Sequence, residues 1–199
     1  MHGTNPYAQA GWYNPQNPLS LNTFSTPTPS VFGALPYPSS QTTLPTVLSF
    51  HFVLLNPNVL NCMITGPTSI PFLEIVSNAQ TTQFRKPDGR VLAAVEWSAN
   101  PTVEISGALS RRYVSQWMPL SSDRSRRSLN INGQEYLWIA TSNALCLFFA
   151  ATPASGYLVR VQRGNGSITM ELTAEAFQLG LLESAIVATV ILQSGRNIP

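Results

Sequence analysis

The chain has 199 residues, of which 44% are hydrophobic and only 10% are charged, with a formal net charge of +2. This length suffices to bury the core of one domain and leaves room for an appendage. No charged residue precedes Glu74, and eight of the eleven basic residues lie between Arg85 and Arg127, a window with a net charge of +4. The bias falls well short of a nucleic-acid-binding charge pattern, so we do not expect a nucleic-acid partner.

The cysteines and the first residues of the chain indicate the cellular compartment in which the protein is expected. The chain has two cysteines, Cys62 and Cys146, each beside apolar neighbours, and no Cys-x-x-Cys or Cys/His cluster. The start is polar and proline-rich, unlike a secretory signal, and no apolar run is long enough for a transmembrane helix. We therefore expect reduced, buried thiols, no metal or other cofactor, and a cytoplasmic protein that is intracellular and not secreted.

Residues 1–45 differ in composition from the rest. They hold eight of the sixteen prolines, many Asn, Ser, Thr and Gln residues, and no charge beyond His2. Such a segment has too few periodic apolar positions for a core, which predicts a disordered tail followed by a folded domain over residues 46–199. Aromatic residues spaced through it are typical of a weakly interacting tail, although a leader without a dedicated partner explains the composition as well.

Short alternating segments follow, which is the pattern of half-buried strands. In the first, Leu48, Phe50, Phe52 and Leu54 share one face. Tight turns such as Pro87-Asp88-Gly89 and Asn132-Gly133 separate the segments, and the latter is a strong hairpin signal. The expected strands are 47–55, 61–65, 72–77, 81–86, 90–97 (with Val91, Ala93, Val95 and Trp97 inward), 102–106, 113–118, 128–131, 134–140, 145–150, 157–163 and 167–172.

The end of the chain predicts two helices. Thr173 is a suitable N-cap for a short helix over 174–179. The segment 181–193 is apolar apart from Glu183, Ser184, Thr189 and Gln193, which scatter around a helix instead of forming one face. Its β-branched residues leave a buried strand as a rival, but its length and the stop at Gly195 favour a helix. A helix apolar on every side fits best inside a closed or nearly closed antiparallel β-barrel, so the predicted class is mainly β, with the C-terminal helix at the centre.

Several motifs from residue 47 to the end resemble an uncharacterised domain-of-unknown-function family abundant in mushroom-forming fungi. The motifs are Asp88-Gly89-Arg90, Val95-Glu96-Trp97, the run 117–124 (WMPLSSDR), Asn132-Gly133 with Tyr136 and Trp138, and the run 188–196 (ATVILQSGR). The layout is also similar to the tubby-like and LURP-one barrel, in which strands wrap a hydrophobic C-terminal helix. The fungal family implies a fold and little chemistry, because it has no established activity.

Catalytic signals are weak. A nucleophilic pair of Cys62 and His51 is conceivable, but nothing in the spacing specifies it, and structural roles are expected. Glu96 and Glu104 fall on solvent-type faces of adjacent strands and are expected to be solvated. We therefore predict that the chain is not an enzyme.

The best candidate site is a basic loop. Arg124, Arg126 and Arg127 stand among serines within four residues, and guanidinium groups beside hydroxyls can hold a phosphate. With Arg111 and Arg112 they make the predicted anion-binding set. Tubby-like domains bind phosphoinositide headgroups, although their lipid-site motif is not recognisable here. The alternatives are an exposed loop that aids solubility and a structural pair of Asp123 and Arg124.

Two functions stay open at this point. The first is a non-enzymatic intracellular binding or scaffold module with an unknown protein partner. The second is a peripheral membrane module that binds anionic phospholipid headgroups through the arginine-rich loop. The position of the five arginine side chains in three dimensions distinguishes the two.

Overall fold

The computed structural model describes residues 46–55 and 58–199, and the predicted tail over residues 1–45 lies outside them. The chain divides into two units, Met1–Thr42 and Thr43–Pro199, and all described residues belong to the second. Its strands are β1 (Val47–Leu54), β2 (Cys62–Thr65), β3 (Pro71–Ser77), β4 (Thr81–Arg85), β5 (Val91–Glu96), β6 (Thr102–Ile105), β7 (Leu109–Tyr113), β8 (Arg126–Ile131), β9 (Gln134–Ala140), β10 (Leu145–Phe149), β11 (Val159–Arg163) and β12 (Ser167–Thr173). Its helical elements are α1 (Val114–Trp117), the 3₁₀ turn η2 (Pro153–Ser155), α2 (Ala174–Gln178) and α3 (Leu182–Gln193).

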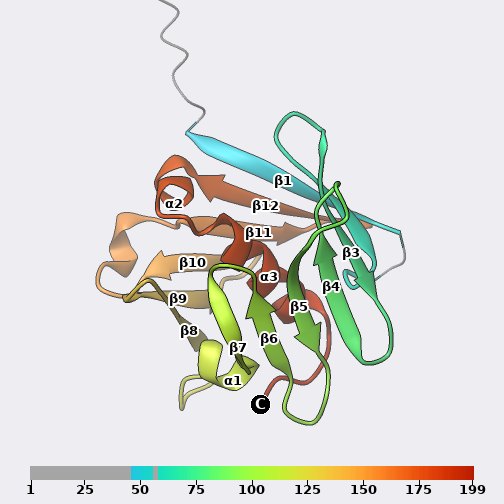
Figure 1. Cartoon of the computed structure of the whole chain (residues 1–199). Coiled ribbons are helices and arrows are strands. Elements are labelled where there is room, and N and C mark those ends of the chain that lie inside the picture. The colour runs from blue at the N-terminus through green and yellow to red at the C-terminus, as the bar shows by residue number, and fades with distance from the viewer. Residues whose placement is uncertain (1–45, 56–57) are drawn as a thin grey trace, which may run out of the picture. The chain divides into compact units, whose positions relative to one another are not determined.

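All twelve strands form one antiparallel sheet in the order β7-β6-β5-β4-β3-β2-β1-β12-β11-β10-β9-β8. Strands that are consecutive in the chain are neighbours in the sheet, except β7 and β8, which form its two edges. The pairing of β1 with β12 joins the two halves. The sheet curves around α3, which lies between the two halves in Figure 1. The prediction of a mainly β architecture is confirmed.

The sheet is not closed. The edge strands are β7 and β8, and within residues 58–199 no ladder joins them. The chain passes from one edge to the other through α1, where a strand over 113–118 was predicted. Val114, Trp117 and Met118 are all buried, and their spacing of three and four residues is helical. The closed form of the predicted barrel is therefore not confirmed.

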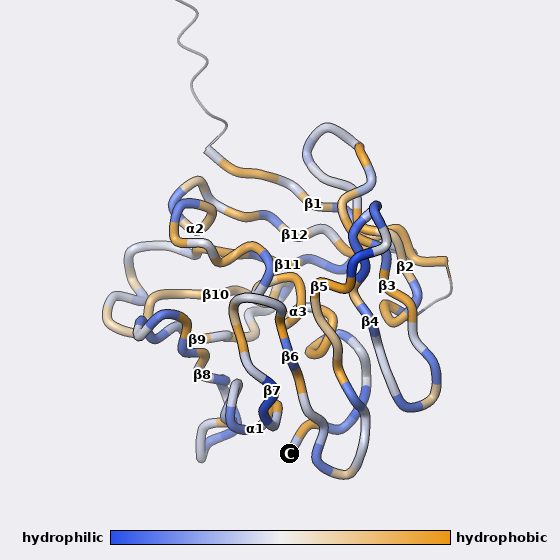
Figure 2. Tube along the Cα trace, in the orientation of Figure 1, coloured by the Kyte–Doolittle hydropathy of each residue, from blue (hydrophilic) through white to orange (hydrophobic). Residues whose placement is uncertain are grey.

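The core lies between the inner face of the sheet and α3. Every residue of α3 from Ser184 to Ile191 is buried, and Val187, Ala188, Val190 and Ile191 are each 0% exposed although they point in different directions. Figure 2 shows the matching hydrophobic colour of this helix. The expectation of a central helix with no solvent-exposed face is confirmed. No helix among residues 46–55 and 58–199 is long and apolar enough to cross a membrane.

Turn chemistry fixes the register of the hairpin that matters most for the site. Asn132 and Gly133 both have positive φ, +52° and +80°, as a two-residue hairpin turn of type I′ requires. The turn sets Ser128 opposite Leu137 and Asn130 opposite Glu135. On α2, the Thr173 side chain accepts a hydrogen bond of 3.2 Å from the Ala176 amide, which confirms the predicted N-cap.

Candidate functional site

A hollow lies on the outer face of β8 and β9, on the side of the sheet away from α3. It has a volume of about 360 Å³ and is lined by Pro119, Leu120, Ser121, Arg126, Ser128, Glu135, Leu137 and Ala150. Ligand pockets in proteins usually measure about 300–1,000 Å³, so the hollow has room for a small ligand or a few residues of a partner.

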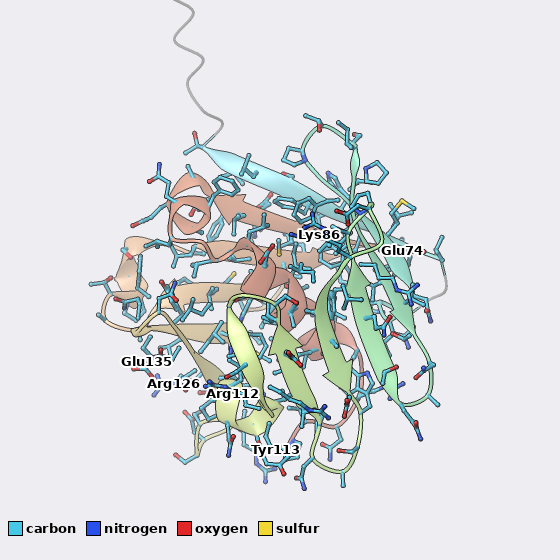
Figure 3. All side chains as sticks on the ribbon, in the orientation of Figure 1. Glu74, Lys86, Arg112, Tyr113, Arg126 and Glu135 are labelled. Carbon is cyan, nitrogen blue, oxygen red and sulfur yellow. The ribbon has the colours of Figure 1, made fainter. Side chains whose placement is uncertain are left out.

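Strand periodicity determines which side chains line the floor of the hollow. Side chains alternate between the faces of a strand, so Arg126 and Ser128 point outward from β8 while Arg127 and Leu129 point inward. From β9, Glu135 and Leu137 point outward as the cross-strand neighbours of Asn130 and Ser128. Figure 3 labels Arg126 and Glu135 at this corner of the sheet.

One rim of the hollow is the segment 119–121, which runs beside the first residues of β8. The Ser121 amide donates to the Arg126 carbonyl at 2.9 Å, and the Ser128 amide donates to the Pro119 carbonyl at 3.1 Å. These bonds cover the start of the β8 edge, and they leave the side chain of Leu120 38% exposed. The rim is therefore a fixed backbone wall with an apolar side chain on it.

Asp123 holds the loop between this rim and β8. Its carboxylate accepts hydrogen bonds from the Ser121 hydroxyl at 2.5 Å, the Ser125 hydroxyl at 2.8 Å and the Ser125 amide at 3.1 Å. The Ser121 bond, followed by the two from Ser125, keeps the pKa of Asp123 well below its usual value. The alternative of a structural pair of Asp123 with Arg124 is wrong in its partner, because the carboxylate fixes the loop through Ser121 and Ser125.

Two of the five predicted arginines are engaged elsewhere. The guanidinium of Arg127 is half-buried and donates to the carbonyls of Met118 at 2.8 Å and Ile198 at 2.9 Å. Burial lowers its pKa. Arg111 on β7 forms a salt bridge with Glu96, on the same outer face. Neither guanidinium points to a shared anion site with the loop.

The other three arginines are exposed and form no salt bridge within the described part of the chain. Arg124 stands in the turn after Asp123, in the left-handed backbone region with a φ of +57°. Arg112 comes from the edge strand β7, and Figure 3 labels it with the neighbouring Tyr113. Among the five, Arg126 alone lines the hollow.

Ser128 was among the serines predicted to stand beside the arginines, whereas Glu135 and Leu137 were not predicted as site residues. A signal for them was present, since the Asn132-Gly133 turn fixes the pairing of β8 with β9 and hence the outward set. The first strand of the hairpin was expected to begin at Ser128, two residues after its actual start at Arg126. The residues that point outward from the two strands were therefore not assigned to a site.

A second hollow of about 340 Å³ lies on the outer face of β2, β3 and β4 and includes Met63, Glu74, Arg85 and Lys86. Its cations already have partners. Arg85 donates to the Gln83 side chain at 2.7 Å, and Lys86 lies 3.4 Å from a Glu183 carboxylate oxygen. The β8–β9 hollow is therefore the better candidate, because the charges of Arg126 and Glu135 form no salt bridge within the described residues.

Neither cysteine lines either hollow. Cys62 is 0% exposed, and burial raises the pKa of its thiol to about 12. Cys62 points inward from β2, whereas His51 is exposed on the outer face of β1, so the two cannot form a nucleophile–base pair. Cys146 is also buried, and burial raises the pKa of its thiol. The expected buried, reduced thiols are confirmed for both residues.

Comparison with known proteins gives two findings. The model of a family of unknown function (DUF6593) matches residues 57–197. The X-ray structure of a protein from Arabidopsis thaliana aligns with a TM-score of 0.40 and 9% sequence identity, over 73% of this chain and 93% of that one. No curated protein matches the chain.

Proposed function

The chain belongs to the DUF6593 family of unknown function, and we propose that it is a binding module that acts without catalysis. The observation that supports this most is that only the outer face of the sheet is free, whereas the inner face packs against a helix. The inner face is occupied by α3, whose central residues are buried on all sides. With the inner face filled, we place the partner on the outer face, where the β8–β9 hollow presents a cation, an anion and two serine hydroxyls.

The state of the nucleophilic side chains supports a role without covalent chemistry. The thiolate is the reactive form of cysteine, and a pKa of about 12 keeps Cys62 protonated at neutral pH. We propose a cytoplasmic location, in keeping with two free thiols, and a protein as the partner. We also propose that the chain is similar to the fungal family through its sequence motifs. Its similarity to the tubby-like barrel is proposed because the sheet wraps a hydrophobic C-terminal helix.

Affinity capture with matched variants tests the binding module. The full chain, the variant Arg126→Ser with Ser128→Asp, and the control Arg163→Ser are used as baits in extracts of the organism's own cells. Arg163 is an exposed arginine on β11, outside the hollow. We expect a partner that the full chain and the control retain and the hollow variant loses. An identical set of proteins on all three baits would contradict the assignment.

A second candidate is a peripheral membrane module that binds anionic phospholipid headgroups. The observation in its favour is that Arg112, Arg124 and Arg126 form no salt bridge within residues 58–199. Tyr113, next to Arg112 in the chain, and Leu120, in the hollow with Arg126, are 47% and 38% exposed. Arginines beside exposed aromatic and aliphatic side chains are typical of surfaces that bind membrane interfaces.

Vesicle sedimentation tests this second candidate. Vesicles of phosphatidylcholine with 5% phosphoinositide should bind the full chain at low salt, and Arg112→Ser, Arg124→Ser and Arg126→Ser together should abolish binding. The interaction should weaken steeply with salt, because exposed charges are screened within about 10 Å at 0.1 M ionic strength. Absence of binding at low salt would exclude the membrane module.

A further inference from the structure

The charges in the β8–β9 hollow stand in a fixed order along the strands. Arg126 lies at one end, Ser128 with its cross-strand neighbour Leu137 lies in the middle, and Glu135 lies at the other end beside Asn130. Four residues separate Arg126 from Asn130, which is about 14 Å along a strand with a rise of about 3.4 Å per residue. The hollow is therefore a trough with opposite charges at its two ends.

Its charged ends are available for a ligand. Arg126 and Glu135 are both exposed and line the same hollow, and neither forms a salt bridge with another described residue. The wall at the β8 edge is already bonded to the strand through the Ser121 and Ser128 amides. An occupant at this end thus lies on the face of the sheet and does not add to its edge.

We propose that the trough binds an extended peptide segment of a partner protein, with an acidic residue and a basic residue four positions apart and a small or apolar residue midway between them. An extended peptide has nearly the same rise per residue as β8, and its side chains at positions i, i+2 and i+4 point to one side. The acidic side chain then meets Arg126, the middle one covers Ser128 and Leu137, and the basic one meets Glu135. This inference rests on the proposed function and names the chemistry of the partner.

The carboxylate of Glu135 favours a peptide over a phosphorylated headgroup. A headgroup gains from Arg126 alone, because the carboxylate at the other end of the trough offers a phosphate no attraction and repels it weakly. A ligand with both charges in the right order gains at both ends. The effect of replacing Glu135 on binding therefore distinguishes a peptide ligand from a phosphorylated headgroup.

A display library of randomised eight-residue peptides, selected against the full chain, tests the inference. We expect enriched peptides to carry the acidic–x–small or apolar–x–basic pattern. The exchange Arg126→Glu with Glu135→Arg should weaken these peptides about tenfold or more, and versions with the acidic and basic residues exchanged should bind the exchanged protein. The control exchange Arg163→Glu with Glu104→Arg, at exposed positions outside the hollow, should leave binding unchanged.

Each other result overturns the peptide trough in a distinguishable way. Enriched peptides without the pattern, or peptides insensitive to the exchange, would leave a binding module whose site lies elsewhere. Absence of any enriched peptide, combined with phosphoinositide vesicle binding that Glu135→Gln strengthens, would assign the hollow to anionic headgroups. Absence of both would overturn the inference and leave the capture experiment to decide the proposed function. Thermal unfolding of the exchanged protein, and recovery of binding by the charge-exchanged peptides, guard against misfolding as the cause of a loss.

Discussion

The guanidinium of Arg127 on β8 donates a hydrogen bond of 2.9 Å to the carbonyl of Ile198, 71 residues further along the chain. The same group also donates to the carbonyl of Met118 at 2.8 Å. After α3, Arg196 stacks over the Trp97 ring at 4.8 Å and donates to the carbonyl of Ala79 at 3.0 Å. The segment after α3 is thus held to both halves of the open sheet by two arginines.

The first prediction concerns Arg127. Replacement by Met keeps the length of the side chain and removes its donors, so the free energy of unfolding should fall by about 2 kcal/mol, the usual range for hydrogen bonds to a charged group. Arg127→Lys should recover part of the loss, because one ammonium group does not reproduce the planar set of donors. Urea denaturation monitored by circular dichroism measures both effects.

The adjacent Arg126 provides the control. It is exposed, and no hydrogen bond of its side chain to another described residue is present. Arg126→Met should therefore change the free energy of unfolding by no more than about 0.5 kcal/mol. Equal losses for the two variants would contradict the assignment of Arg127 to the fold and Arg126 to the surface.

The same pair shows what the sequence could and could not predict about the site. The cluster Arg124, Arg126 and Arg127 was visible as a local concentration of charge, but its members point in different directions once β8 begins at Arg126. Strand alternation turns Arg127 inward, opposite Trp138, and Arg126 outward. The predicted start of this strand at Ser128 leaves both arginines in the loop, where strand alternation does not apply. The sequence therefore did not distinguish the direction of Arg126 from that of Arg127.

The strands were predictable where alternation had a clear apolar face, as with Phe50 and Phe52 on β1, which are 3% and 0% exposed. β7 was missed because it is an edge strand with four exposed residues and no apolar alternation. Val91 was expected inside and is 44% exposed, since a bulge between Phe84 and Arg85 shifts the register of β5. Bulges and edges depend on the neighbouring strands, which local patterns do not contain.

The second prediction compares two threonines that are both 0% exposed. Thr82 Oγ1 accepts a hydrogen bond of 2.8 Å from Trp97 Nε1 and lies 2.7 Å from Ser77 Oγ. Thr82→Val leaves both groups without this partner and should cost about 1–3 kcal/mol. Thr189 Oγ1 has a thioether partner, Met170 Sδ at 3.7 Å, which is a weak acceptor. Thr189→Val should therefore be neutral or stabilising.

Denaturant unfolding of the two single variants measures the contrast. The substitutions are chemically identical and the positions equally buried, so differences in packing volume largely cancel. A loss at Thr189 as large as that at Thr82 would show that the hydroxyl on α3 is bonded more strongly than its partner implies.

The third prediction concerns α3. Ala188 and Val190 are both 0% exposed and point in different directions around the helix. An unpaired buried ion costs several kcal/mol, comparable with the whole stability of about 5–15 kcal/mol of a domain. Ala188→Glu and Val190→Asp, made separately, should each give unfolded or aggregated protein in a solubility and circular dichroism assay. The control Gln193→Glu, at the half-buried end of α3, should stay soluble; a soluble, stable Ala188→Glu protein would imply a wet face on this helix.

The fourth prediction follows from the thiol of Cys62, whose pKa burial raises from 9.0 to about 12. Below pH 9 the thiol is protonated in both the folded and the unfolded chain, and its contribution to stability is constant. Between pH 9 and pH 12 the unfolded chain releases this proton and the folded one keeps it, so stability is lost as pH rises, by up to about 1.4 kcal/mol per pH unit. Cys62→Ala lacks this proton, and all other titratable groups are common to the two proteins and cancel in the difference. Urea unfolding of the two proteins from pH 7 to pH 11 should show parallel curves up to about pH 9 and a steeper decline for the natural chain above it. Parallel curves over the whole range would mean that the Cys62 thiol ionises as readily inside the sheet as in the unfolded chain.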